Sequence, residues 1–204
     1  MKTISKPERE YDFVIAGSGF GGSVAALRLT EKGYKVLVIE KGRHYRPEDF
    51  PRTNWNLRRW LWLPSLGFHG FFKMTFLRHI GILSGVGVGG GSLVYANTLP
   101  RPPGEFFAKE LAEKMSAIIK GKPFVMTTEA LFGIPTTAHI LGGAVIGSSA
   151  ENGVVDIIHK VFGYENIYIC DGSTVPANPG VNPSLTITAM SERAMSKIPE
   201  KKRL

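Results

Sequence analysis

The sequence predicts an α/β fold in which helices flank a parallel β-sheet, and three features of its 204 residues support this. Residues 11–16 and 34–40 are continuous apolar runs, which are typical of strands buried in a parallel sheet. Between them, residues 23–33 space their apolar side chains as a helix does and stop at Gly33. A glycine-rich turn follows the first run, so residues 11–40 are expected to form a β-α-β unit.

The rest of the chain is less regular in pattern. Residues 41–84 are expected to be irregular, basic and aromatic, and a proline-rich break follows at 100–104. A helix with one broad apolar face is predicted over 105–120, and an apolar strand is predicted over 167–170. A last helix is expected over 184–198, after Asn182 and Pro183.

Composition limits the class of protein. Apolar residues make up 43% of the chain and charged residues 21%, which is typical of a globular protein. A single cysteine, Cys170, excludes a disulfide framework and a cysteine-based zinc site, and we expect no metal site. The first residues are polar and lack the apolar core of a signal peptide, so a cytoplasmic location is expected.

The net charge of +8 is concentrated in one stretch. No acidic residue occurs between Asp49 and Glu105, and all three tryptophans lie there. Such a segment could contact nucleic acid, an anionic membrane surface or a polyanionic cofactor. No nucleic-acid motif accompanies the charge, so residues 50–80 are a candidate for peripheral membrane contact instead. Charged residues, proline and glycines interrupt every window that could span a bilayer.

A dinucleotide-binding motif lies in the turn of the β-α-β unit. Gly17, Gly19 and Gly22 match the pattern G-x-G-x-x-G in the required context between a strand and a helix. The candidate ligand-binding residues here are Gly17, Ser18, Gly19, Phe20, Gly21, Gly22, Glu40 and Lys41. Glu40 ends the second strand, where an acid would accept hydrogen bonds from an adenosine ribose. The alternatives are a glycine turn without a ligand and a solvated Glu40, and the motif does not distinguish FAD from NAD.

A second glycine cluster occupies residues 85–91, with five glycines in seven positions. Such a run keeps side chains away from a flat ligand and exposes backbone N–H groups. A flavin needs both features, whereas NAD enzymes have no general need for a second cluster. The alternative is a flexible loop. The candidate cofactor-binding residues in and after this cluster are Gly87, Gly89, Gly90, Gly91, Ser92, Tyr95 and Asn97.

The order of the motifs resembles the glucose–methanol–choline (GMC) oxidoreductases, and most closely their cholesterol-oxidase-like branch. The resemblance rests on GSGFGGS, VLVIEKG, GVGVGGGSLVYAN, TTAHILGG and the run from YENIYICDGS to NPSLTITAMSERAM. Together these motifs cover roughly residues 10–103 and 125–198. The resemblance implies a single Rossmann-like FAD-binding domain assembled from these two segments and joined by a shortened connection at 104–124.

The resemblance also implies chemistry. A substrate alcohol, of sterol type, would give a hydride to N5 of FAD, with O₂ or another acceptor taking the electrons. His139 and Asn182 would be the catalytic pair, Asp171 and Gly172 would approach the ribityl–phosphate arm, and Pro183 would lie at the flavin. Each has a structural alternative: Asn182 as a helix N-cap with Pro183 at the first helical position, His139 as a core histidine, and Asp171-Gly172 as a plain turn.

The resemblance is incomplete, because only about 35 residues join Pro103 to Thr137, where the family carries its substrate-binding domain. We therefore expect a truncated or minimised alcohol oxidoreductase. A FAD-binding remnant without alcohol turnover is the alternative. Sheet edges exposed by such a deletion would also favour self-association.

Overall fold

The computed structural model describes residues 10–51, 55–78, 80–94 and 136–202. The predicted helix at 105–120, the connection at 104–124, and candidates Tyr95 and Asn97 lie outside these described residues.

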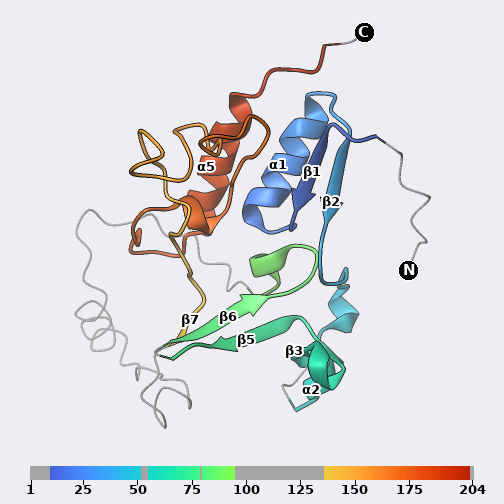
Figure 1. The fold of residues 1–204 in the computed structure, drawn as a ribbon. Helices are drawn as coiled ribbons and strands as arrows, with labels where there is room; N and C mark the ends of the chain where they lie inside the picture. Colours follow the sequence, from blue (N-terminus) through green and yellow to red (C-terminus); the bar gives the residue numbers. More distant parts are fainter. Residues whose placement is uncertain (1–9, 52–54, 79, 95–135, 203–204) are drawn as a thin grey trace, which may run out of the picture.

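The predicted β-α-β unit is present at the start of the described chain (Figure 1). Strand β1 (Phe13–Ala16) pairs in parallel with β2 (Val36–Ile39), and helix α1 (Phe20–Glu31) connects them. The helix begins directly after Gly19 and is followed by Gly33, whose φ of 85° is a left-handed conformation that glycine adopts without strain. The α/β fold class with a parallel strand pair and a flanking helix is therefore confirmed.

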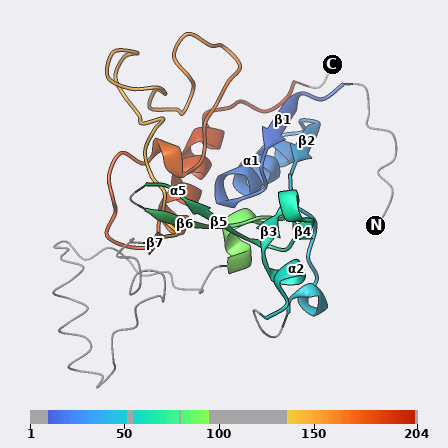
Figure 2. The same cartoon turned by 60° about the horizontal axis from the view of Figure 1, so that its bottom comes forward.

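The largest apolar core lies between α1 and α5 (Ser184–Ser196), which run side by side in both views (Figures 1 and 2). Its buried members are Ala25, Leu29, Ala194, Met195 and Ile198, and Phe13 and Ile15 of β1 pack against them. This core holds the first and last described segments of the chain together. Burial of its apolar surface stabilises that contact.

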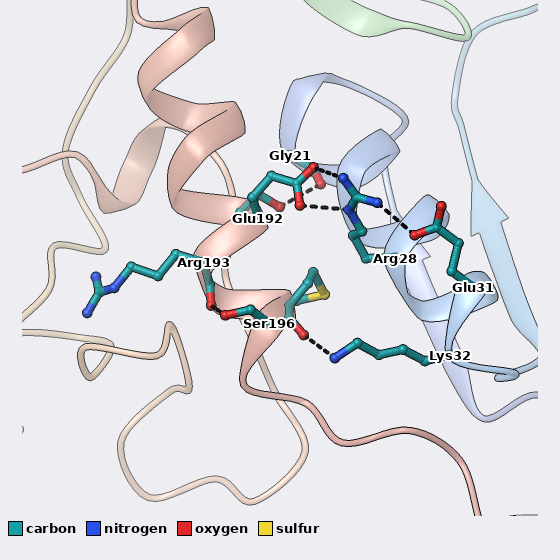
Figure 3. Close-up of polar contacts among 9 residues, drawn as sticks. Gly21, Arg28, Glu31, Lys32, Glu192, Arg193 and Ser196 are labelled. Carbon is teal, nitrogen blue, oxygen red and sulfur yellow. Dashed lines mark hydrogen bonds and ion pairs between the residues drawn. The ribbon is translucent and has the colours of Figure 1, made fainter.

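Polar contacts fix how the two helices are aligned along their axes (Figure 3). Arg28 of α1 makes a two-pronged contact with the Glu192 carboxylate, at 2.7 and 2.8 Å, and Lys32 donates to the Met195 carbonyl at 2.8 Å. The buried Ser191 hydroxyl donates to the Gly21 carbonyl at 3.0 Å. Residue numbers in these contacts rise together along the two helices, from Gly21 and Ser191 to Lys32 and Met195, so the helices run in the same direction. Ser184 lies seven residues before Ser191, so α5 starts about 10 Å beyond the start of α1.

The middle of the chain forms small antiparallel units rather than the irregular segment that its sequence suggests. Helix α2 (Leu57–Trp60) precedes β3 (Trp62–Leu63), which pairs with β4 (Phe68–His69). Strand β5 (Phe72–Phe76) pairs with β6 (Gly81–Gly85), and β7 (Thr136–Thr137) joins β6 in parallel. Single-turn 3₁₀ helices occur at Pro47–Asp49, Pro64–Leu66, Gly90–Val94 and Gly172–Thr174 (η1 to η4).

The strand predicted over 167–170 is wrong, because this segment pairs with a neighbouring turn instead. Val161 N donates to the Ile167 carbonyl at 2.9 Å, and Ile169 N donates to the His159 carbonyl at 3.0 Å. A cavity of about 280 Å³ separates the segment from β1. Within the described residues, the sheet of the β-α-β unit therefore contains β1 and β2 alone. No helix in the described part of the chain is long and apolar enough to cross a membrane.

The α1–α5 core leads to a stability prediction. Leu29→Ala should lower the free energy of unfolding by about 2–5 kcal/mol, because it opens a cavity at a side chain that is only 2% exposed. Leu27→Ala, on the same helix at 53% exposure, should change it by about 0.5 kcal/mol or less. Denaturant unfolding measures both, and equal effects of the two changes would contradict this account of the core.

Candidate functional site

The glycines of the first motif divide into two pairs with different surroundings. A Cβ built on Gly21 would lie 1.5 Å from the Cys170 carbonyl oxygen, and one on Gly22 would lie 2.1 Å from the Gly17 oxygen. Gly17, whose φ is 91°, and Gly19 would meet nothing within 4 Å. The first pair therefore permits close packing of the protein, whereas the second pair faces open space. Gly19, at the N-cap of α1, has no side chain to cap the helix, and the N-terminus of a helix favours an anion in such a space.

Ser18 links this loop to both β2 and the second glycine cluster. Its backbone N–H and its hydroxyl both donate to Oε2 of Glu40, at 3.0 and 2.9 Å. Gly42 N donates to the other carboxylate oxygen at 3.0 Å, and Gly89 N donates to the Ser18 hydroxyl oxygen at 3.1 Å. Ser18 is only 7% exposed, whereas Glu40 and Gly89 are partly exposed, so the network is partly buried. Glu40 therefore lies inside the loop network rather than free in solvent.

The electrostatics of Glu40 follow from these contacts. Burial raises the pKa of the Glu40 carboxyl group. The hydrogen bonds from Gly42, Ser18 and the Lys41 backbone together lower this pKa by more than burial raises it, so the pKa lies below the usual value. Glu40 is thus an acceptor at neutral pH. The Lys41 side chain is exposed beside this network.

The second glycine cluster packs directly on the first motif. A Cβ on Gly90 would lie 2.9 Å from the Gly19 Cα, and one on Gly91 would lie 3.3 Å from the Phe20 ring. Gly87, Gly89 and Gly90 all have positive φ, at 144°, 106° and 54°. The cluster is therefore a defined turn whose backbone touches the first loop. The Ser92 hydroxyl donates within this turn, to the Gly89 carbonyl at 3.0 Å.

One cavity of about 570 Å³ brings together segments that are far apart in the sequence. This volume lies in the range of small-molecule sites. The candidate residues that line it are Phe20, Gly91, His139, Asp171, Gly172, Asn182 and Pro183. The motif search did not single out Leu83, Ser84, Val94 and Ile187, which add mainly apolar wall. Their only sequence signal is that they adjoin the glycine cluster or the α5 start.

The segment around His139 is fastened to the turn at Asp171. Gly142 N donates to the Gly172 carbonyl at 3.1 Å, and Ala144 N donates to the Ser173 carbonyl at 3.0 Å. Asp171 caps the η4 turn, since its Oδ1 accepts from Ser173 N at 2.9 Å. Asp171 and Gly172 therefore form a turn and also line the cavity. His139 is exposed rather than in the core, and its partial burial lowers its pKa below the usual value.

Helix α5 begins at the cavity, at Ser184 as predicted, and ends at Ser196, two residues earlier than predicted. The Pro183 carbonyl accepts the first helical hydrogen bond, from Ile187 N at 2.8 Å, which gives Pro183 the N-cap position although its backbone is already in the right-handed helical region. The alternative with Asn182 at the N-cap and Pro183 at the first helical position therefore differs from the structure by one residue. Asn182 instead stands at the cavity wall just before the helix. Among the described residues, no group of three His, Cys, Asp or Glu side chains could hold a metal ion.

The β-α-β unit, its glycine loop and the adjoining cavity define a protein of the Rossmann-like dinucleotide-binding class. Comparison with family models agrees, because residues 15–58 match an NAD(P)-binding Rossmann-like domain and residues 108–191 match GMC oxidoreductase. Over residues 108–191 the chain is thus similar to the GMC oxidoreductase family.

Several characterised relatives share part of this sequence. It is 58% identical over 94 residues to a cholesterol oxidase of Acinetobacter baumannii, covering 46% of this chain and 17% of the relative. It is 58% identical over 101 residues to a cholesterol oxidase of Mycobacterium tuberculosis, covering 50% of this chain and 18% of the relative. A long-chain-alcohol oxidase of Arabidopsis thaliana is 39% identical over 114 residues, covering 55% of this chain and 15% of that protein. The chain thus spans less than a fifth of the length of these relatives.

The two kinds of glycine predict different effects on folding. Gly21→Ala should lower the free energy of unfolding by about 3 kcal/mol, because its new Cβ overlaps the backbone of Cys170 and not a flexible side chain. Gly19→Ala has open space and an allowed φ of −69°, so it should change stability by about 0.5 kcal/mol or less. Thermal unfolding of both variants checks this, and a Gly21→Ala chain as stable as Gly19→Ala would contradict the packing.

Proposed function

We propose that the chain binds FAD, with the dinucleotide arm along the two glycine loops and the flavin ring in the 570 Å³ cavity. The observation that carries the proposal is the convergence of four separate segments on one cavity: the first motif, the second cluster, the His139–Gly172 pair of loops and the start of α5. Segments that pack only for stability usually leave few voids larger than a water molecule, so an open volume where these motifs meet favours a ligand.

The arrangement of the two helices supports this placement. The N-terminus of a helix carries a partial positive charge and free N–H groups, and it therefore favours anions. The start of α1 lies at the open glycines and would face the pyrophosphate. The start of α5 lies about 10 Å further along a parallel axis, at the cavity, and would face the ring. Glu40 would accept a hydrogen bond from the adenosine ribose.

The residues at the cavity fit alcohol oxidation. FAD, when bound, supplies the acceptor for the hydride that leaves the alcohol carbon. His139, whose lowered pKa keeps it neutral near pH 7, would accept the hydroxyl proton. Asn182 would orient the hydroxyl from the opposite loop. The apolar walls at Leu83, Val94 and Ile187 favour a hydroxyl on an apolar skeleton, as in the sterols and long-chain alcohols for which the relatives are named. O₂ or another acceptor would then reoxidise the flavin.

A second candidate is FAD binding without alcohol turnover. The observation that favours it is the exposure of His139 in the described structure. Water at a proton acceptor weakens electrostatic control of the reaction, because a site gains strength when water is excluded. The dinucleotide-binding residues do not depend on that exclusion.

The Ser18 network leads to a prediction about ligand selectivity. Ser18→Ala removes a hydrogen bond to the Glu40 carboxylate and the acceptor for Gly89 N, so FAD should bind about tenfold more weakly. FMN lacks the adenosine ribose that Glu40 would hold, so its affinity should change less than about twofold.

Fluorescence titration with both flavins measures these affinities, and Ser196→Ala is the matched control because its hydroxyl donates to the Arg193 carbonyl within its own helix, away from the glycine loops. Equal weakening of FAD and FMN by Ser18→Ala would show general loosening of the loop and not an effect through Glu40.

His139 separates turnover from binding. In anaerobic mixing with a 3β-hydroxysterol, the flavin absorbance of the wild type should bleach. His139→Gln should slow this step by about 10²-fold or more while leaving FAD bound. The wild-type rate should fall as the pH drops through the lowered pKa of His139, below about 6.5, because the protonated ring cannot accept a proton.

The outcome also distinguishes the two candidates. A yellow wild type that no sterol or long-chain alcohol bleaches would support FAD binding without turnover. Bleaching that is unchanged in His139→Gln would remove His139 from the mechanism.

A further inference from the structure

A second surface of the molecule lies away from the cavity, on the unit formed by α2, β3, η2 and β4. Two runs of this unit, residues 55–59 and 63–67, are exposed at every position. They carry large apolar side chains: Trp55 is 89% exposed, Leu57 48%, Leu63 37% and Leu66 65%. Single exposed apolar residues are ordinary, and four within twelve positions of one small unit make a candidate contact surface. We call these four residues the apolar tip.

The tip is held in place by the structure beneath it. The Trp60 ring stacks on Phe72 with centroids 4.8 Å apart, and Asn56 caps α2 by accepting from Arg59 N at 3.3 Å. Gly70 N donates to the Leu61 carbonyl at 2.8 Å, which joins α2 to the start of β5. Figure 2 shows α2, β3 and β4 gathered together, apart from the α1–α5 pair. The apolar tip is thus presented on a packed support.

Basic side chains outnumber acidic ones around the tip, with Arg43, Arg46 and Arg59 close to Asp49. Arg58 and Arg59 are exposed on α2 between Leu57 and Trp60, and the sequence has no acidic residue from 50 to 104. The nearest acidic residues, Glu48 and Asp49, lie on η1, and Arg59 donates to both of their carbonyls, at 3.2 and 3.0 Å. At the other hairpin, Phe76 and Leu77 are 56% and 54% exposed beside the exposed Arg78.

We propose that the apolar tip docks on the surface of an anionic lipid bilayer. Tryptophan and leucine insert at the boundary between headgroups and acyl chains, while arginines beside them contact the lipid phosphates. Each basic side chain near an anionic surface contributes about 1 kcal/mol of attraction. The charge of the tip complements such a surface, and its apolar side chains gain by leaving water. This proposal does not depend on FAD binding.

The same charge could attract nucleic acid, but the chemistry of the tip favours lipid. Binding to a phosphate backbone uses many basic groups along a groove, with aromatic rings that stack on bases. Here the exposed basic groups of α2 are two, and three of the four apolar side chains are leucines, which offer nothing to a base or a phosphate.

Vesicle co-sedimentation tests the proposal. The full chain is mixed with vesicles of phosphatidylcholine alone and with vesicles of phosphatidylcholine and phosphatidylglycerol at about 3:1, in low and high salt. The wild type should sediment with the anionic vesicles and be largely released in high salt, because surface charges are screened. Trp55→Ala and Leu66→Asp should each reduce the partition coefficient by about fivefold or more.

A matched control distinguishes binding through the apolar tip from non-specific binding through any exposed apolar residue. Ile157 is 62% exposed, close to the 65% of Leu66, and lies in a different segment. Ile157→Asp should bind as the wild type does. A wild type that stays in the supernatant with anionic vesicles would overturn the proposal, as would equal loss in Ile157→Asp and Leu66→Asp. If the wild type does not bind vesicles but slows the migration of a DNA duplex in a gel, the partner of this surface is nucleic acid and not lipid.

Discussion

The contact between α1 and α5 is the constraint on which the rest of the structure depends. It joins residues that lie more than 160 positions apart in the chain, and it does so through backbone as well as side chains. Gly21 carries no Cβ where the Cys170 carbonyl approaches, and Ser191 bonds to the Gly21 carbonyl. These contacts set how the two helices lie against each other, and so where their partial positive charges point. The cavity is located by the same contacts, because α5 forms one of its walls.

A second constraint acts within the loops. Ser18, Glu40 and Gly89 connect the first glycine motif, the end of β2 and the second glycine cluster through hydrogen bonds of 2.9 to 3.1 Å. The two glycine clusters thereby act as one unit, and their positive-φ residues are turns with defined partners. A loop held in this way can present its backbone N–H groups before a ligand arrives, and such preorganisation reduces the cost of binding.

The sequence predicts local features better than long-range pairing. The β-α-β unit follows from apolar periodicity and Gly33, which depend only on neighbouring residues. The apolar run at 167–170 has the composition of a strand, but a strand needs a partner edge. This segment instead forms its backbone hydrogen bonds with the turn at His159. Strands β3 and β4 have two residues each, too few for a periodic signal, and β6, GILSG, begins and ends with glycine. Strand β5, FKMTF, does alternate between apolar and polar residues, but over five residues only. The wall residues Leu83 and Val94 carry no motif, and only packing brings them to the cavity.

The central claim is that distant segments build one FAD site, and direct titration of the purified chain with FAD tests it. The account predicts saturable quenching of flavin fluorescence at one FAD per chain, with the flavin retained through a desalting column. The thermal midpoint should rise with it, since a ligand at 100 times its Kd adds about 2.7 kcal/mol to the stability of the folded state. A folded chain that leaves FAD fluorescence and its own thermal midpoint unchanged would contradict the account.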